Sequence, residues 1–423
     1  MDEHRKSRAS GWPRISTIPV VVLLLIAACS TAIWSARAET DPPSVAWPEA
    51  GPESEGFDAD ALDRLAADLA GRNTKALFVA RHGRLVYEWY APDFGPNHRH
   101  YTAAMAKGTA AIPALLAAAN NGYLSLADPV AAWVPSWAED PARAQVLVRD
   151  LAAHRSGLED IDFDAGAAAS LDGWRQSYYD HPGERFRLAL DSAEFRFAPA
   201  TGFGYSGVGY YVLSYVMARA LQSESSSARD VLSLLAESVY DPLGIPPEAW
   251  SIGYARRDTV DGVAMTHLGS GGELTARAAA RIGQLFAQDG CFEGRRLLDG
   301  YLVRLALGEA GTPPAGEEEG AEAPVSALGW WRGGNGAWPS LPVSAVAAIG
   351  AGHQVVAIDP ARDLVAVRLG GDLSGGNEPF HAALDRYLWE PLYDALVPAQ
   401  PSRPHDADDL KNDRAGTCRS EER

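Results

Sequence analysis

One lysine stands out as a residue that could do chemistry. Lys107 opens a run that is almost wholly apolar and ends at Gly122. A helix that is apolar on every side is expected to be buried, and glycine commonly ends a helix. A buried ammonium group is costly, and the chain otherwise carries nearly all of its positive charge as arginine. We therefore expect Lys107 to be kept for function.

Two hairpins and several helices are predicted around this lysine. The stretch Lys75–Tyr90 alternates apolar and polar residues around His82-Gly83, which is typical of a β-hairpin. Residues 354–358 and 364–369, joined by Asp359–Asp363, are predicted to form a second hairpin. Helical periodicity with end signals marks four further segments, namely Phe57–Gly71, Ala228–Val239, Thr275–Gln288 and Glu378–Ala395.

This order of elements predicts an α/β (α+β) fold. Early strands pairing with late strands would build an antiparallel sheet from residues 75–95 and 345–395, flanked by helices. The residues between them, 105–325, would form a large helical subdomain. We therefore expect one domain over residues 45–397, followed by a charged, apolar-poor and disordered tail over 398–423.

Two segments are predicted to be surface loops. Glu309–Pro324 is rich in Gly, Pro, Ala and Glu. Asp162–Gly183 carries Trp174, Tyr178 and Tyr179. An aromatic-pinned surface loop is the favoured interpretation of this second segment, and a loop that overhangs a site is the alternative.

The stretch Tyr101–Lys107 resembles the active-site segment of the serine β-lactamase and penicillin-binding-protein superfamily, and more narrowly the class-C-like "β-lactamase-related" esterases and amidases. Their motif is Ser-x-x-Lys at a helix N-terminus. Residues three apart lie on one helix face, so the lysine amine can take the proton of the serine. Lys107 matches this lysine, but Ala104 stands in the position of the nucleophile.

Three further stretches follow in the family's order. Gly122–Val130 resembles "Gly-x-Leu-x-Leu-Asp-Asp-Pro-Val", and Val148–Leu158 resembles "Arg-x-Leu-Leu-x-His-x-Ser-Gly-Leu". Phe197–Tyr210 resembles "Phe-x-Pro-Gly-x-x-x-x-Tyr-Ser-Asn-x-Gly-Tyr". The resemblance covers roughly residues 48–396, far more than one short motif. It implies a β-lactamase/transpeptidase-like fold.

The resemblance also implies roles for single residues. In the family the serine attacks an acyl carbonyl while the lysine and a tyrosine share the role of base. Tyr205 occupies the position of that tyrosine, and its alternative is a core aromatic. Gly207 replaces the asparagine that follows two residues later. His154 matches a histidine outside the catalytic set and is interpreted as structural.

A third family motif, a Lys/His-Thr/x-Gly strand, should fall near residues 350–354. The alignment puts Ala351 at the cationic position and His353 at a glycine position. A shift of register would bring His353 to the site instead, and a packed strand residue is the equal alternative. The predicted ligand-binding residues are Gly207, Gly350, Ala351, Gly352 and His353.

The first 38 residues are predicted to be a targeting segment. A charged start precedes the apolar run Ile18–Ile33, and Ala36-Arg-Ala38 offers a small-x-small cleavage site. Cleavage after Ala38 is favoured. The alternatives are a lipobox that leaves Cys29 as a lipidated N-terminus, and an uncleaved anchor. All three predict a periplasmic, cell-envelope or extracellular protein.

Composition limits the partners. A net charge of −18 argues against nucleic acid and anionic lipid surfaces. Membrane contact is expected only through the leader. The cysteines are Cys29, Cys291 and Cys418, and we do not expect Cys291 and Cys418 to pair, because the tail is predicted to be disordered. No residue cluster predicts a metal, and no cofactor is expected.

Three functions remain open. The first is an exported protein that binds a small acyl, ester, amide or peptidoglycan-like ligand and is catalytically impaired, because Ala104 cannot attack. The second is a working esterase, amidase or β-lactamase with a variant site. The third is a non-catalytic cell-envelope interaction protein whose pocket is filled.

Overall fold

The computed structural model describes residues 45–161, 171–222, 230–308, 325–333 and 336–397, together with Cys418. The predicted leader, including Cys29, and the rest of the predicted tail lie outside the described residues. The described residues from Val45 onward belong to one compact unit. Within the part of the chain that the structure describes, no helix is both long and apolar enough to cross a membrane.

The helices are α2 (Ala59–Ala70), α3 (Ile112–Asn120), α4 (Val148–Ala152), α5 (Gly173–Asp180), α6 (Arg185–Asp191), α7 (Gly207–Ala220), α8 (Val231–Leu235), α9 (Ala276–Ala287), α10 (Gly300–Ala306), α11 (Phe380–Leu384) and α12 (Glu390–Asp394). The strands are β1 (Thr74–Arg81), β2 (Arg84–Tyr90), β3 (His100–Tyr101), β4 (Trp250–Ser251), β5 (Asp258–Val260), β6 (Val263–Met265), β7 (Glu273–Leu274), β8 (Cys291–Phe292), β9 (Arg295–Arg296), β10 (Val325–Ser326), β11 (Trp331–Arg332), β12 (Val346–Gly350), β13 (Gln354–Asp359) and β14 (Leu364–Gly370).

The main sheet joins the two ends of the domain, as the order of elements predicts. Its strand order is β10-β11-β12-β13-β14-β1-β2, and every neighbouring pair is antiparallel. The early strand β1 pairs with the late strand β14, with Phe78 opposite Val367. The predicted mixed fold with an antiparallel sheet is therefore confirmed.

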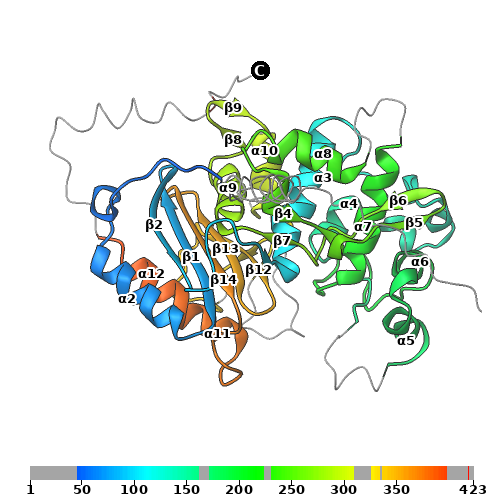
Figure 1. Cartoon of the computed structure of the whole chain (residues 1–423). Coiled ribbons are helices and arrows are strands. Elements are labelled where there is room, and N and C mark those ends of the chain that lie inside the picture. Colours follow the sequence, from blue (N-terminus) through cyan, green and yellow to red (C-terminus); the bar gives the residue numbers. More distant parts are fainter. Residues whose placement is uncertain are drawn as a thin grey trace, which may run out of the picture. The chain divides into compact units, whose positions relative to one another are not determined.

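The central strands β12, β13 and β14 are mostly apolar and are buried along their whole length. On β1, Ala76 and Phe78 face one core, whereas Leu77 and Val79 face the other. This alternation follows from the two-residue period of a strand. Helices α2, α11 and α12 cover one face and α9 packs on the other (Figure 1).

The local signals explain the first helix. The side chain of Asp58 accepts a hydrogen bond from the Ala61 N–H at 3.1 Å and caps α2. Its buried residues Leu62, Leu65 and Leu69 form one apolar face, and Gly71 ends the helix. The predicted helices near residues 228–239, 275–288 and 378–395 are also present, although the first and last contain π-helical turns.

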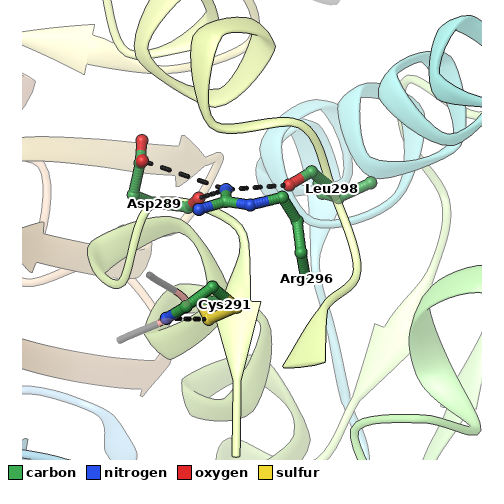
Figure 2. The surroundings of a disulfide bond; sticks show 5 residues. Asp289, Cys291, Arg296 and Leu298 are labelled. Carbon is green, nitrogen blue, oxygen red and sulfur yellow. Dashed lines mark hydrogen bonds and ion pairs between the residues drawn. A yellow bond between two sulfur atoms is a disulfide. The ribbon is translucent and has the colours of Figure 1, made fainter. Parts of the chain in front are cut away.

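A disulfide bond corrects one expectation. Cys291 at the start of β8 is bonded to Cys418, with 5.8 Å between the two Cα atoms (Figure 2). Next to it, Arg296 donates hydrogen bonds to the backbone oxygens of Asp289 and Leu298, at 2.8 and 3.4 Å. The prediction that Cys291 and Cys418 do not pair is wrong, because composition shows how polar a tail is but not where its cysteine lies.

Candidate active site

A short turn carries Ala104. Strand β3 ends at Tyr101, and a 3₁₀ turn follows over Ala103–Met105. Ala103 has a φ of +46°, in the left-handed region that costs a residue with a Cβ about 1–2 kcal/mol. A strained backbone of this kind persists only where the surroundings hold it.

Strand β12 holds this turn in place. A Cβ on Gly350 would lie only 2.9 Å from the Met105 nitrogen and 3.1 Å from the Ala103 Cβ. A glycine at position 350 is therefore what allows the strand to lie directly against the Ala104 turn. On the opposite side, the Thr102 N–H donates to the Gly272 oxygen at 2.8 Å.

The helix that follows differs from the simple α-helix that the sequence predicts. Lys107–Ala111 is a π-helical turn, and α3 begins only at Ile112. Pro113 has no N–H to donate to Thr109, four residues earlier. The hydroxyl of buried Tyr240 donates to that Thr109 oxygen instead, at 2.7 Å. π-helical turns occur frequently at functional sites.

Lys107 is buried, with 4% of its surface exposed. Its Nζ donates to the Tyr205 hydroxyl at 2.7 Å and to the Gly269 backbone oxygen at 3.0 Å. It also lies 4.9 Å from the centre of the Tyr210 ring, within cation–π range. These contacts compensate the buried ammonium group and bring together the lysine and the tyrosine that the sequence predicts.

His154 packs against Tyr205 and bonds to the residue that follows it. The Ser206 N–H donates to Nδ1 of His154 at 3.0 Å, and the two rings of His154 and Tyr205 stack 4.5 Å apart. Burial, followed by the charge of Lys107, holds the pKa of His154 well below its usual 6.5. Ser206 caps α7 by accepting from the Gly209 N–H. His154 therefore has the structural role that the sequence predicts.

The missing side chain at Gly207 leaves room for a carboxylate. A Cβ at this position would lie 3.4 Å from Oδ1 of Asp160. That oxygen accepts a hydrogen bond from the Val208 N–H at 3.3 Å, at the start of α7. Burial raises the pKa of Asp160, partly offset by backbone hydrogen bonds and by the charge of Lys107. A carboxyl group thus lies beside the position that an amide holds in the family's motif.

Ala104, Lys107, Tyr205 and Gly207 open onto one pocket of about 620 Å³. The remaining lining residues are Asp160, Ile161, Tyr178, Arg185, Arg196, Tyr211, Tyr254, His267 and Ser270. The residues predicted from the third motif are not in this lining. Gly350 supports the turn from behind, and Ala351 and Gly352 form the turn after β12.

His353 is a packed residue. It is 1% exposed and stacks on Phe380 with 4.0 Å between ring centres. Its Nδ1 accepts from the Leu373 N–H at 3.2 Å, and its Nε2 lies 3.1 Å from the Phe380 oxygen. Of the two roles that the sequence left open for His353, the structure places it in the packed one.

Several pocket residues carry no sequence prediction. His267 and Ser270 belong to the loop before β7, and Asp160 lies just after the matched His154 motif. A histidine and a serine three residues apart are a detectable signal for His267 and Ser270, but nothing local links them to Lys107. Tyr178 was predicted to lie in a surface loop, but it belongs to helix α5, and its side chain lines the pocket.

Comparison with known proteins decides the family. The Beta-lactamase family model matches residues 62–387. The chain belongs to the Beta-lactamase family. It is 27% identical over 332 residues to the 6-aminohexanoate-dimer hydrolase of Paenarthrobacter ureafaciens, an alignment that spans 73% of this chain and 76% of that protein.

Solved structures agree with this assignment at the level of fold. A candidate 6-aminohexanoate-dimer hydrolase from Bacillus anthracis superposes with a TM-score of 0.62 at 17% identity, over 85% of this chain and 90% of that one. A penicillin-binding-protein homologue from Caulobacter crescentus gives a TM-score of 0.59 at 17% identity, over 80% and 97% of the two chains. The predicted superfamily and its fold are therefore confirmed.

The arrangement has clear chemical limits. This Beta-lactamase-family site holds an ammonium and a phenol in hydrogen-bond contact, which can move a proton. Ala104 offers no oxygen to attack an acyl carbonyl. Among the described residues, no group of three or more His, Cys, Asp or Glu is arranged to hold a metal ion.

Proposed function

We propose that this protein binds a small acyl, ester, amide or peptidoglycan-like ligand in the pocket beside Lys107, and that no acyl-enzyme forms at position 104. The observation that carries the proposal is the open pocket, in which Lys107 and Tyr205 keep their 2.7 Å hydrogen bond around an alanine. In the subtilisin series, loss of the nucleophile costs roughly 10⁶ in kcat. The family's serine route is therefore impaired here.

The chemistry of the lining supports a polar, peptide-like ligand. Lys107, Arg185 and Arg196 offer positive charge, whereas Asp160 offers a carboxyl group. The related hydrolase from Paenarthrobacter ureafaciens acts, by its name, on the 6-aminohexanoate dimer. We propose a linear amide of this kind as the first ligand to test.

A working esterase, amidase or β-lactamase is the second candidate. It is favoured by the intact contact of Lys107 with Tyr205 and by a serine hydroxyl in the same pocket. A protein with a filled pocket, acting only through its surface in the cell envelope, is the third. The volume of about 620 Å³ beside Ala104 argues against it.

Export is part of the proposal. The predicted leader and the Cys291–Cys418 disulfide support a location outside the reducing cytoplasm. N-terminal sequencing of the protein secreted by a bacterial host should begin at Glu39. A lipidated Cys29 would replace cleavage after Ala38 with lipoprotein processing, and an intact Met1 in the cytoplasmic fraction would refute export.

The ligand-binding proposal is tested by calorimetry and mass spectrometry. We expect saturable binding of the 6-aminohexanoate dimer, weakened at least tenfold by Lys107→Met, and a covalent β-lactam or fluorophosphonate adduct at residue 104 only in Ala104→Ser. Lack of saturable binding by the natural protein would refute ligand binding. Failure of Ala104→Ser to react at residue 104 would show that the site lacks more than the attacking oxygen.

A further inference from the structure

A serine hydroxyl lies in the wall of the same pocket, next to a histidine. Oγ of Ser270 is 3.0 Å from Nε2 of His267, and both residues line the pocket together with Ala104 and Lys107. A hydroxyl within 2.6–3.2 Å of a base is the geometry of an activated nucleophile. Neither Lys107 nor Tyr205 takes part in this contact between His267 and Ser270.

The ring of His267 is held in place and in its neutral form. Its ring stacks on Tyr211 with 3.9 Å between ring centres, at an angle of 14°, which fixes the ring plane. Burial, then the charges of Lys107 and Arg185, lower the pKa of His267 well below 6.5, so the ring is neutral. In the tautomer that carries the proton on Nδ1, Nε2 accepts the Ser270 O–H.

Nδ1 of His267 is buried and has no hydrogen-bond partner among the described residues. Leaving a buried polar nitrogen unpaired costs about 1–3 kcal/mol. The unpaired Nδ1 is free to carry the proton of the tautomer in which Nε2 accepts from Ser270.

The surroundings of Ser270 fit a reacting centre. Lys107 donates to the oxygen of the preceding residue, Gly269, at 3.0 Å, so its ammonium group holds the backbone segment that carries Ser270. The Tyr254 hydroxyl lies 3.2 Å from Oγ of Ser270. Tyr254 and Ala255 both have left-handed backbones, with φ of +57° and +53°. Backbone strain of this kind is concentrated at active sites and ligand clamps.

We propose that Ser270 is a nucleophile and His267 its general base, acting on the acyl carbonyl of an ester or amide bound in the pocket. The ligand class rests on the proposed function above. The Ser270 oxygen bonds to the carbonyl carbon while its proton passes to Nε2 of His267. Collapse of the tetrahedral intermediate breaks the bond to the alcohol or amine, which leaves with that proton. Water, deprotonated by the same nitrogen, then releases the carboxylic acid and regenerates the Ser270 hydroxyl.

The experiment treats the full-length natural protein with a fluorophosphonate and maps the adduct by peptide mass spectrometry. We expect labelling on Ser270. Ser270→Ala should lose it, and His267→Gln should slow it by about 10²–10⁴-fold, the usual contribution of a general base. Ser251→Ala, a nearby serine outside the pocket lining, is the matched control and should label like the natural protein. Ser270→Cys should restore acylation, seen as a burst of p-nitrophenol from p-nitrophenyl acetate.

Two outcomes would overturn the proposal. One is an unlabelled Ser270 in the natural protein while Ala104→Ser is labelled at residue 104, because the pocket would then be reactive but Ser270 would not. The other is a labelling rate that His267→Gln leaves unchanged. Calorimetry of Ser270→Ala with the 6-aminohexanoate dimer separates the two proposals. Binding without labelling of the natural protein refutes the Ser270 role alone, whereas labelling without binding refutes the ligand class alone.

Discussion

Lowering the pH from 7 to 5 is expected to destabilise the protein through two buried histidines beside the pocket. Burial and the charge of Lys107 hold the pKa of His154 and of His267 well below 6.5 in the folded state. The unfolded chain takes up a proton on each as the pH falls through 6.5, whereas the folded chain takes it up only at lower pH. The stabilisation is therefore complete above pH 6.5 and is lost progressively below it.

The magnitude follows from linkage. As long as the folded state keeps it neutral, each such histidine lowers the free energy of unfolding by about 1.4 kcal/mol per pH unit below 6.5, so that about 2 kcal/mol is its upper limit at pH 5. The upper limit for the two together is roughly 4 kcal/mol at pH 5, against the 5–15 kcal/mol that is typical of a folded protein.

Urea unfolding at a series of pH values measures this dependence. His154→Asn isolates one histidine, because the asparagine oxygen can accept the Ser206 N–H that Nδ1 accepts now. Its pH slope between 6 and 5 should be smaller than that of the natural protein by about 1.4 kcal/mol per unit. His98→Asn, at an exposed histidine, is the control for the change from histidine to asparagine itself. Equal slopes for His154→Asn and the natural protein would refute the assignment of a neutral, proton-excluding His154.

Three further changes test the supports of the site. Gly350→Ala would put a Cβ 2.9 Å from the Met105 nitrogen, so it should lower the free energy of unfolding by about 1–3 kcal/mol. In an Ala104→Ser background it should also slow fluorophosphonate labelling of residue 104, and an unchanged labelling rate would contradict the supporting role of β12. Tyr240→Phe leaves the Thr109 oxygen without its donor, so the free energy of unfolding in urea should fall by about 1–3 kcal/mol. An unchanged free energy of unfolding would show that another group donates to this oxygen. Cys418→Ser should lower the free energy of unfolding by about 2–5 kcal/mol, and the melting temperature of this variant should not respond to reductant. If reductant leaves the melting temperature of the natural protein unchanged as well, the disulfide does not form.

The sequence predicted much of the fold, because the relevant signals are local. Alternation around His82-Gly83 and a capping Asp58 with an apolar helix face depend only on neighbours along the chain. The same holds for the apolar run after Lys107, which identifies a buried lysine without any structure. Ordered motifs then extended these local signals to a superfamily, and the family match over residues 62–387 agrees with it.

Local patterns were weaker wherever a partner lies far along the chain. The π-helical turn after Lys107 depends on a tyrosine hydroxyl that arrives from residue 240. The disulfide joins residues 127 positions apart. The sequence left two roles open for His353, because the face to which a residue at a strand end points depends on the register of the strand. The structure shows that His353 packs against Phe380.

The sequence by itself determined that a buried lysine stands three residues after an alanine, in a chain built as strands, helices and strands again. It also determined that Tyr205 follows in a stretch of matching pattern. Only the tertiary structure decided that Ala104, Lys107 and Tyr205 share a pocket with His267 and Ser270. The physical reason is that these side chains come from a turn, a helix start and a loop, which meet only where the two cores on either side of the sheet are packed. Hydrogen bonds such as that from Lys107 to the Gly269 oxygen then join residues that are far apart in the sequence.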